Sequence, residues 1–198
     1  VLYCTPKRIF SFPLLHTTHL PAHQPIQSNP TQMQSIIRRI FGDRKLPENM
    51  SDAEYDSFMQ TNFPKWITEF EQGGFLEKTK LPPIADEDAL VDVLMSVPKE
   101  DLVVIKYWKH GCVPCLSFAE MYKAAEQMCL AEQKRIHWFS VDTKSPAAKG
   151  LVDYQIVDGT PTIQTFRGGR QVGSEIRATQ IDELMRELTK RQIAGSSQ

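Results

Sequence analysis

Two cysteines three residues apart, Cys112 and Cys115, constrain the fold of this chain more than any other feature. They follow an apolar run at 102–105 whose Val and Ile content and charged borders predict a buried strand. Apolar residues then recur at helical spacing over 113–132. We therefore expect Cys112 where a strand ends and a helix begins, so that free N–H groups and the helix dipole stabilise its thiolate, the nucleophilic form of cysteine.

The spacing also allows a disulfide, because Cys115 lies one helical turn after Cys112 and Pro114 is tolerated in a first turn. A C-x-x-C pair can equally be half of a zinc site. Tetrahedral zinc takes four ligands, however, and only Cys129 and His137 follow as candidates. A redox pair is the favoured interpretation, with zinc and two chemically idle packed thiols as alternatives. We expect no metal and no cofactor.

Residues 103–191 resemble a thioredoxin domain. The motifs stand in the family's order: a strand ending at Trp108, Cys-Val-Pro-Cys, a strand at 136–142, Thr160-Pro161-Thr162, a strand at 163–166, a turn at 167–170 and a closing amphipathic helix. The resemblance implies an α/β thioredoxin-like fold, with a central mixed sheet covered by helices on both faces. It also implies that Pro161 is a cis proline beside the cysteines and that the backbone just before it pairs with substrate chain.

The remaining pattern agrees with an α/β fold. Asp86 is a helix cap, and helical spacing follows it until Pro98. The other expected elements are an extended edge strand at 76–84, a short helix at 146–153, strands at 163–166 and 171–176 flanking the hairpin signal Gly168-Gly169, and a last helix with a buried stripe from Ile181 to Ile193.

Composition divides the chain into four parts: a basic, Pro-rich tail at 1–48, a helical extension at 49–75, the thioredoxin-like domain at 76–194 and a frayed end at 195–198. Residues 5–32 are too polar and Pro-rich to bury much apolar surface. We expect them to be disordered unless a partner holds them.

The tail is acid-poor, which is typical of organelle-targeting segments. Four of its apolar residues can share one helix face and two arginines the other: Ile36, Ile37, Ile40 and Phe41, with Arg38 and Arg39. This predicts a mitochondrial targeting segment, with a short surface or partner-binding helix as the alternative. We expect a mitochondrial location, or otherwise a cytoplasmic one. The sequence contains no run of eighteen apolar residues, so no membrane span is predicted.

The helical extension begins with a capping box, Ser51 to Glu54. We expect Pro64 to divide it into two helices, and Gly73-Gly74 to end the second. Its seven large apolar residues exceed what a free linker carries: Tyr55, Phe58, Met59, Phe63, Trp66, Ile67 and Phe70. They pack on the thioredoxin-like domain or dock on another protein, and the first is favoured.

These features predict a thiol–disulfide oxidoreductase acting on protein disulfides, with Cys112 as nucleophile and Cys115 as resolving cysteine. The other expected site residues comprise a substrate-binding set (Trp108, Gly111, Val113, Pro114, Thr160 and Pro161) and a tuning pair (Lys106 and His110). Because the net charge is only −1, no nucleic-acid partner is indicated beyond the basic tail.

Three departures from the thioredoxin pattern weaken the prediction of general thioredoxin activity. Lys106 stands where the family has a buried Asp, Gly111 where it usually has Trp, and Arg177 where it has a Gly before the last helix. Burial could make Lys106 favour the Cys115 thiolate or turn neutral, or its amine could snorkel to solvent. The alternative function is a thioredoxin-fold adaptor in a large mitochondrial assembly, since the layout is loosely similar to phosducin-like co-chaperones.

Overall fold

The computed structural model describes residues 30–194. Of the segment expected to be disordered, residues 30–32 instead begin a helix, α1 (Pro30–Phe41). The rest of that segment and the end at 195–198 lie outside the described residues. Among the described residues, no helix is long and apolar enough to cross a bilayer.

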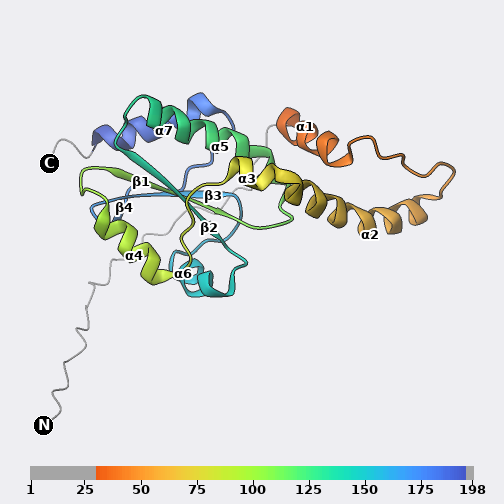
Figure 1. Ribbon diagram of the computed structural model, residues 1–198, viewed down its shortest axis with the longest axis horizontal. Coiled ribbons are helices and arrows are strands. Elements are labelled where there is room, and N and C mark those ends of the chain that lie inside the picture. The colour runs from red at the N-terminus through yellow and green to blue at the C-terminus, as the bar shows by residue number, and fades with distance from the viewer. Residues whose placement is uncertain (1–29, 195–198) are drawn as a thin grey trace, which may run out of the picture.

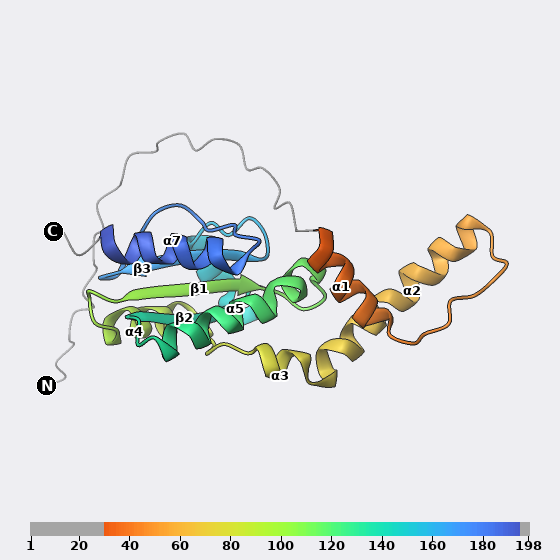
Figure 2. The same ribbon diagram turned by 90° about the horizontal axis from the view of Figure 1, so that it is seen from above.

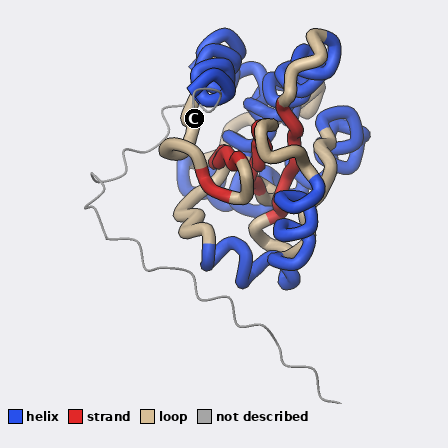
Figure 3. The backbone as a smooth tube through the Cα atoms, turned by 90° about the vertical axis from the view of Figure 1, so that its left-hand side faces the viewer, coloured by secondary structure: helices blue, strands red, loops and turns tan. Residues whose placement is uncertain are grey.

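A mixed sheet of four strands forms the centre of the molecule, with helices around it (Figure 3). The strands, in the spatial order β2-β1-β3-β4, are β2 (Ile136–Asp142), β1 (Leu102–Trp108), β3 (Thr162–Arg167) and β4 (Arg170–Gln171). β1 pairs parallel with β2 and antiparallel with β3, so it is hydrogen-bonded on both sides. This central position explains why nearly all of its side chains are buried.

Successive residues of β1 face opposite sides of the sheet. Leu102 and Val104 pack with α5 (Val113–Ala131) and α7 (Ile181–Ala194). The odd-numbered residues pack with α4 (Glu87–Ser96) and α6 (Lys149–Tyr154), which follows the short 3-10 helix η2 (Pro146–Ala148). Figure 1 shows the two helix layers on either side of the sheet. The fold is therefore the thioredoxin-like α/β arrangement that the sequence predicts.

The N-terminal extension packs on the outside of α5. α1 is followed by α2 (Asp52–Phe70), a kinked segment η1 (Glu71–Phe75) and α3 (Leu76–Thr79). A third apolar cluster, named here the extension cluster, joins them to α5: Ile36, Ile40, Ile67, Phe75, Leu116 and Ala119, with Ile37, Phe63, Trp66, Phe70, Leu76 and Val113 packed against it. The first half of α2 projects beyond the domain (Figure 2). The favoured expectation, packing on the same chain, is therefore confirmed for the second half of the extension.

The extension differs from the prediction in its helix boundaries. α2 runs through Pro64 as one helix, because its capping box starts it at Ser51 and apolar contacts on both sides of Pro64, by Phe63 and Ile67, hold it. Tertiary packing outweighs the local signal of Pro64. The signal of Gly73-Gly74 is confirmed, because both glycines are non-helical, Gly74 with φ +93°, and the short helix α3 starts only after them.

Two expected strands are shorter than predicted. In 76–84, α3 takes the first residues, and the rest follows the edge of β2 only through Ser140, whose N–H donates to the Pro82 carbonyl at 2.8 Å. Pro82 and Pro83 lack the N–H groups that a longer ladder needs. In 171–176, Gly173 has φ +70° and interrupts the strand after β4, so that only Ile176 rejoins β3, as an isolated bridge.

The buried stripe of the last helix also ends earlier than predicted. Leu184, Met185 and Leu188 are buried, but Ile193 is 63% exposed. Ile193 lies in the last turn of α7, and helix ends commonly carry exposed side chains because fewer neighbours surround them.

We predict that Ile40→Ala lowers the free energy of unfolding by about 2–5 kcal/mol, because Ile40 is fully buried in the extension cluster and truncation leaves a cavity. Urea denaturation followed by far-UV circular dichroism measures the change. The matched control is Arg38→Ala on the exposed face of α1, with an expected change within about 0.5 kcal/mol. Equal effects of the two variants would show that α1 is not held by this packing.

Candidate functional site

The cysteine pair lies at the junction of β1 and α5. Cys112 is the N-cap residue of α5, and the Cys115 N–H donates to its Sγ at 3.2 Å. The two cysteines form a disulfide with their Cα atoms 5.2 Å apart. Cys112 is 6% exposed and Cys115 1% exposed, so Cys112 is the more accessible of the two. The helix N-terminus thus favours negative charge on the more accessible sulfur.

The loop before β3 reaches the same sulfur from across the sheet. The Thr160–Pro161 peptide bond is cis, as the resemblance implies. The Thr160 carbonyl oxygen lies 3.7 Å from Cys112 Sγ, and Thr160 Oγ1 donates to that sulfur at 3.5 Å. Residues 48 positions apart in the sequence therefore meet at one reactive atom.

A buried carboxylate of the extension holds the loop in front of the cysteines. Glu71, in η1, is 4% exposed and accepts a hydrogen bond from the Gly111 N–H at 2.9 Å. Gly111 has φ +73°, a conformation that strains other residues, which gives a backbone reason for glycine at this position. Glu71 was not predicted, because no local signal in the sequence distinguishes it from the other acidic residues of the extension.

His110 is held by carboxylates and an aromatic ring. Its Nδ1 lies 3.3 Å from Glu71 Oε2 and its Nε2 lies 3.8 Å from Asp142 Oδ2. Its ring also meets Trp108 edge-on, with centroids 4.8 Å apart. Among the described contacts none joins His110 to the Cys112 sulfur. His110 thus lies in the loop before Cys112 and helps to bind that loop to the extension.

The predicted substrate-binding residues divide between two environments. Thr160 and Pro161 adjoin Cys112, and Pro114 lies half-buried in the first turn of α5. Val113 packs against the extension cluster, so part of its surface is already used within the chain. Arg177, which stands where the family has glycine, forms an ion pair with Glu175 at 3.1 Å.

Lys106 is buried on the α5 side of β1. It is 5% exposed, so its amine does not snorkel to solvent. Its Nζ lies 5.3 Å from the centroid of the Tyr122 ring and 5.9 Å from that of Trp108. Burial lowers the pKa of the Lys106 amine from 10.5 to about 8, because desolvation disfavours the charged form.

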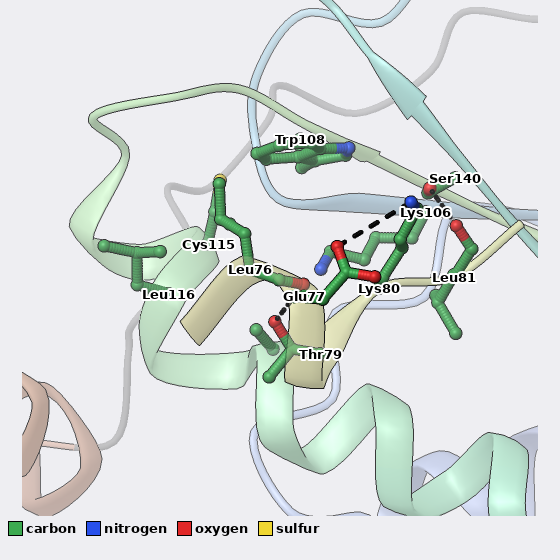
Figure 4. A pocket seen from close by; sticks show the side chains of 11 residues that line it. Leu76, Glu77, Thr79, Lys80, Leu81, Lys106, Trp108, Cys115, Leu116 and Ser140 are labelled. Carbon is green, nitrogen blue, oxygen red and sulfur yellow. Dashed lines mark hydrogen bonds and ion pairs between the residues drawn. The ribbon is translucent and has the colours of Figure 1, made fainter. Parts of the chain in front are cut away.

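Lys106 and Cys115 line one cavity of about 220 Å³ (Figure 4). It opens between β1, β2, α3 and α5 on the side of the cysteine helix that faces the extension. The buried lysine and the second cysteine therefore line the same space, where a positive charge on the lysine favours negative charge on the sulfur.

The residues that could have completed a zinc site do not gather around the cysteine pair. Cys129 is fully buried in the core beneath α5, and His137 Nε2 lies 2.8 Å from Asp101 Oδ2 at the opposite end of β1. Within residues 30–194 there is no group of three or more His, Cys, Asp or Glu side chains placed to hold a metal ion.

We predict that the oxidised protein gains stability relative to Lys106→Met as the pH rises. The Lys106 pKa is about 8 in the folded protein and near 10.5 in the unfolded chain, so the unfolded chain binds more protons between these values. The stabilisation is complete above about pH 10.5 and is lost as the pH falls through 8. From pH 7 to 9.5 the difference in unfolding free energy should change by about 2 kcal/mol.

Urea melts of both proteins at the two pH values measure this change. Burial also raises the pKa of the Tyr107 and Tyr122 hydroxyls, so these groups lower stability only at higher pH and do so in both proteins. A stability difference that does not vary with pH would mean that Lys106 is hydrated in the folded protein.

Known proteins match the C-terminal half of the chain. The thioredoxin family model matches residues 87–190. Protein disulfide-isomerases of Medicago sativa and Triticum aestivum are each 26% identical over 102 residues, which are 52% of this chain and 20% of theirs. The chain therefore spans about a fifth of the length of these curated relatives.

Solved structures also resemble this part of the chain. Fasciola hepatica thioredoxin has a TM-score of 0.47 at 16% identity, over 56% of this chain and 99% of that one. Spinach chloroplast thioredoxin f has a TM-score of 0.48 at 19% identity, over 58% and 95%. The family match at 87–190 covers more than half of this chain and contains the Cys112–Cys115 pair and the cis proline. The chain therefore belongs to the thioredoxin family.

Proposed function

We propose that this protein is a thiol–disulfide oxidoreductase acting on protein disulfides. The observation that carries the proposal is the position of Cys112, at a helix N-terminus, within disulfide reach of Cys115 and beside the Thr160 carbonyl. These are the elements that a dithiol/disulfide cycle requires: a stabilised thiolate, a resolving thiol and an adjacent backbone to which an extended chain can bind.

In the reducing direction, the Cys112 thiolate attacks one sulfur of a substrate disulfide. A Cys112–substrate bond forms, the substrate S–S bond breaks, and the first substrate thiolate leaves and takes a proton from solvent. Cys115 then loses its proton and attacks Cys112 Sγ, which forms the internal disulfide and releases the second substrate thiolate. Two electrons pass from the dithiol to the substrate, and the reverse sequence oxidises a substrate dithiol.

Lys106 acts on the second step in this proposal. The positive charge in the shared cavity favours the Cys115 thiolate, and the fraction of the amine that is neutral can accept the thiol proton. A pKa of about 8 for Lys106 is close to that of an ordinary thiol, so proton transfer between them is nearly balanced.

We predict that Cys112→Ser abolishes reduction of a protein disulfide such as that of insulin, because the nucleophile is lost. Cys115→Ser should instead accumulate a mixed disulfide with the substrate, since the resolving thiol is absent. Non-reducing mass spectrometry detects the adduct. Cys129→Ser is the matched control, because Cys129 lies in the core, and it should retain activity. Full activity of Cys112→Ser would contradict the assignment.

A second candidate function is that of an adaptor, which the projecting half of α2 favours. Tyr55, in the first turn of α2, is 37% exposed. Figure 2 shows that this end of α2 leaves the domain. Large exposed apolar side chains on a projecting helix are suited to docking against another protein, and a mitochondrial assembly is the proposed setting.

We predict that, in an adaptor, Tyr55→Asp abolishes association with the assembly while Cys112→Ser/Cys115→Ser retains it. Size-exclusion chromatography of native extracts with quantitative detection of the protein measures both. Asp56→Ala on the same exposed turn is the control. Loss of association in the double-serine variant alone would instead show that partners are held through the cysteines.

A mitochondrial location is likewise part of the proposal. It is supported by the basic, acid-poor composition of residues 1–48. In α1, Ile36 and Ile40 are buried against the domain, so this helix has a structural role of its own. Import of the full chain into isolated mitochondria, compared with a chain lacking residues 1–29, tests the location.

A further inference from the structure

The cavity between the extension and the sheet is lined mainly by apolar side chains and is open on the side of Glu77 and Lys80. Its walls include Leu76 and Leu81 from the segment that joins the extension to the domain, and Leu116 and Ala119 from α5. Trp108 and Cys115 complete it near the active site (Figure 4). At about 220 Å³, it is smaller than the usual pocket for a drug-sized ligand.

The hydroxyl groups of the cavity already have partners. Thr79 Oγ1 donates to the Phe75 carbonyl at 2.9 Å, and Ser140 Oγ donates to the Leu81 carbonyl at 3.2 Å. Their protons are therefore satisfied by the protein backbone. The remaining polar donor in the lining that is deeply buried is the Lys106 amine.

The buried amine has no carboxylate partner. Within residues 30–194, Lys106 makes no hydrogen bond or ion pair, and its Nζ lies over the rings of Trp108 and Tyr122. The one acidic residue of the lining, Glu77, is paired with Lys80 at 3.8 Å, and both are largely exposed. A buried ammonium without an anion is costly, and an anion that binds beside it offsets that cost.

We propose that this cavity binds a small monocarboxylate with an apolar body, its carboxylate on Lys106 Nζ and its body against Leu76, Leu81 and Leu116. One buried cation matches one negative charge. The apolar walls match a hydrocarbon body better than they match inorganic phosphate or sulfate, which keep strong hydration. The exposed Glu77 carboxylate in the lining repels a second negative charge on the ligand.

The site goes beyond disulfide chemistry, since binding needs neither a free thiol nor electron transfer. Its ligand also lies against Cys115, and neutralising Lys106 removes the positive charge that favours the Cys115 thiolate. This consequence rests on the proposed function: a ligand in the cavity slows the attack of Cys115 on the mixed disulfide.

Titration of the oxidised full chain at pH 7 with hexanoate and with its neutral isostere hexanamide, followed by ¹H–¹⁵N NMR, tests the proposal. Hexanoate should bind at least about tenfold more tightly than hexanamide, because a charge-assisted hydrogen bond is lost with the amide. In Lys106→Met, which keeps an apolar stem of similar length, this preference should disappear.

Two further variants separate the cavity from its surroundings. Lys80→Met removes a cation from the exposed part of the lining and should keep the preference within about twofold, since exposed ion pairs contribute little. Ala119→Leu adds volume to the cavity from its α5 wall and keeps the Lys106 amine, so it should weaken both ligands. The backbone spectrum of each variant reports whether it is folded.

Three results would overturn the proposal. Equal affinity for hexanoate and hexanamide would exclude recognition of charge, and loss of the preference in Lys80→Met as large as that in Lys106→Met would assign it to the surface. No binding of either ligand up to its solubility limit would mean that the cavity takes no ligand of this kind. None of these results bears on reduction of protein disulfides by Cys112.

Discussion

The structure depends on the alternation of side chains along β1. This strand is hydrogen-bonded on both edges, so it lies in the middle of the sheet. Its side chains point alternately to the two faces, and each face is covered by a core. The even-numbered residues face α5, and Lys106 is one of them, placed in line with Leu102 and Val104. Because side chains alternate along the strand, Lys106 must lie on the same face as Leu102 and Val104. The strand that leads to Cys112 therefore also places a lysine beneath α5.

Sequence patterns predicted the elements that carry their own physical signal. The Val- and Ile-rich β1, the Asp86 cap and the Cys112 junction with α5 lie as expected, since each depends on neighbours a few residues away. The prediction failed where long-range packing decides. α2 continues through Pro64 because other helices hold it, and the expected edge strand became α3 and an isolated bridge at Pro83, where consecutive prolines supply no N–H.

The candidate site shows the same division. The cysteines and the Thr160–Pro161 loop were expected from spacing and resemblance, and the structure brings them together at one sulfur. Glu71 and the cavity could not be predicted, because they arise only when the extension lies against the domain. The chemistry of Lys106 was left open by the sequence, and its burial decides between a hydrated amine and a desolvated one.

The hydrogen bond from Gly111 to Glu71 has a mechanical consequence. Glu71 follows directly on α2, whose first half projects from the domain while its second half packs in the extension cluster. A displacement of α2 therefore moves the carboxylate that fixes the backbone before Cys112. A protein bound to the projecting end of α2 would thus be coupled to the cysteine loop without touching the cysteines.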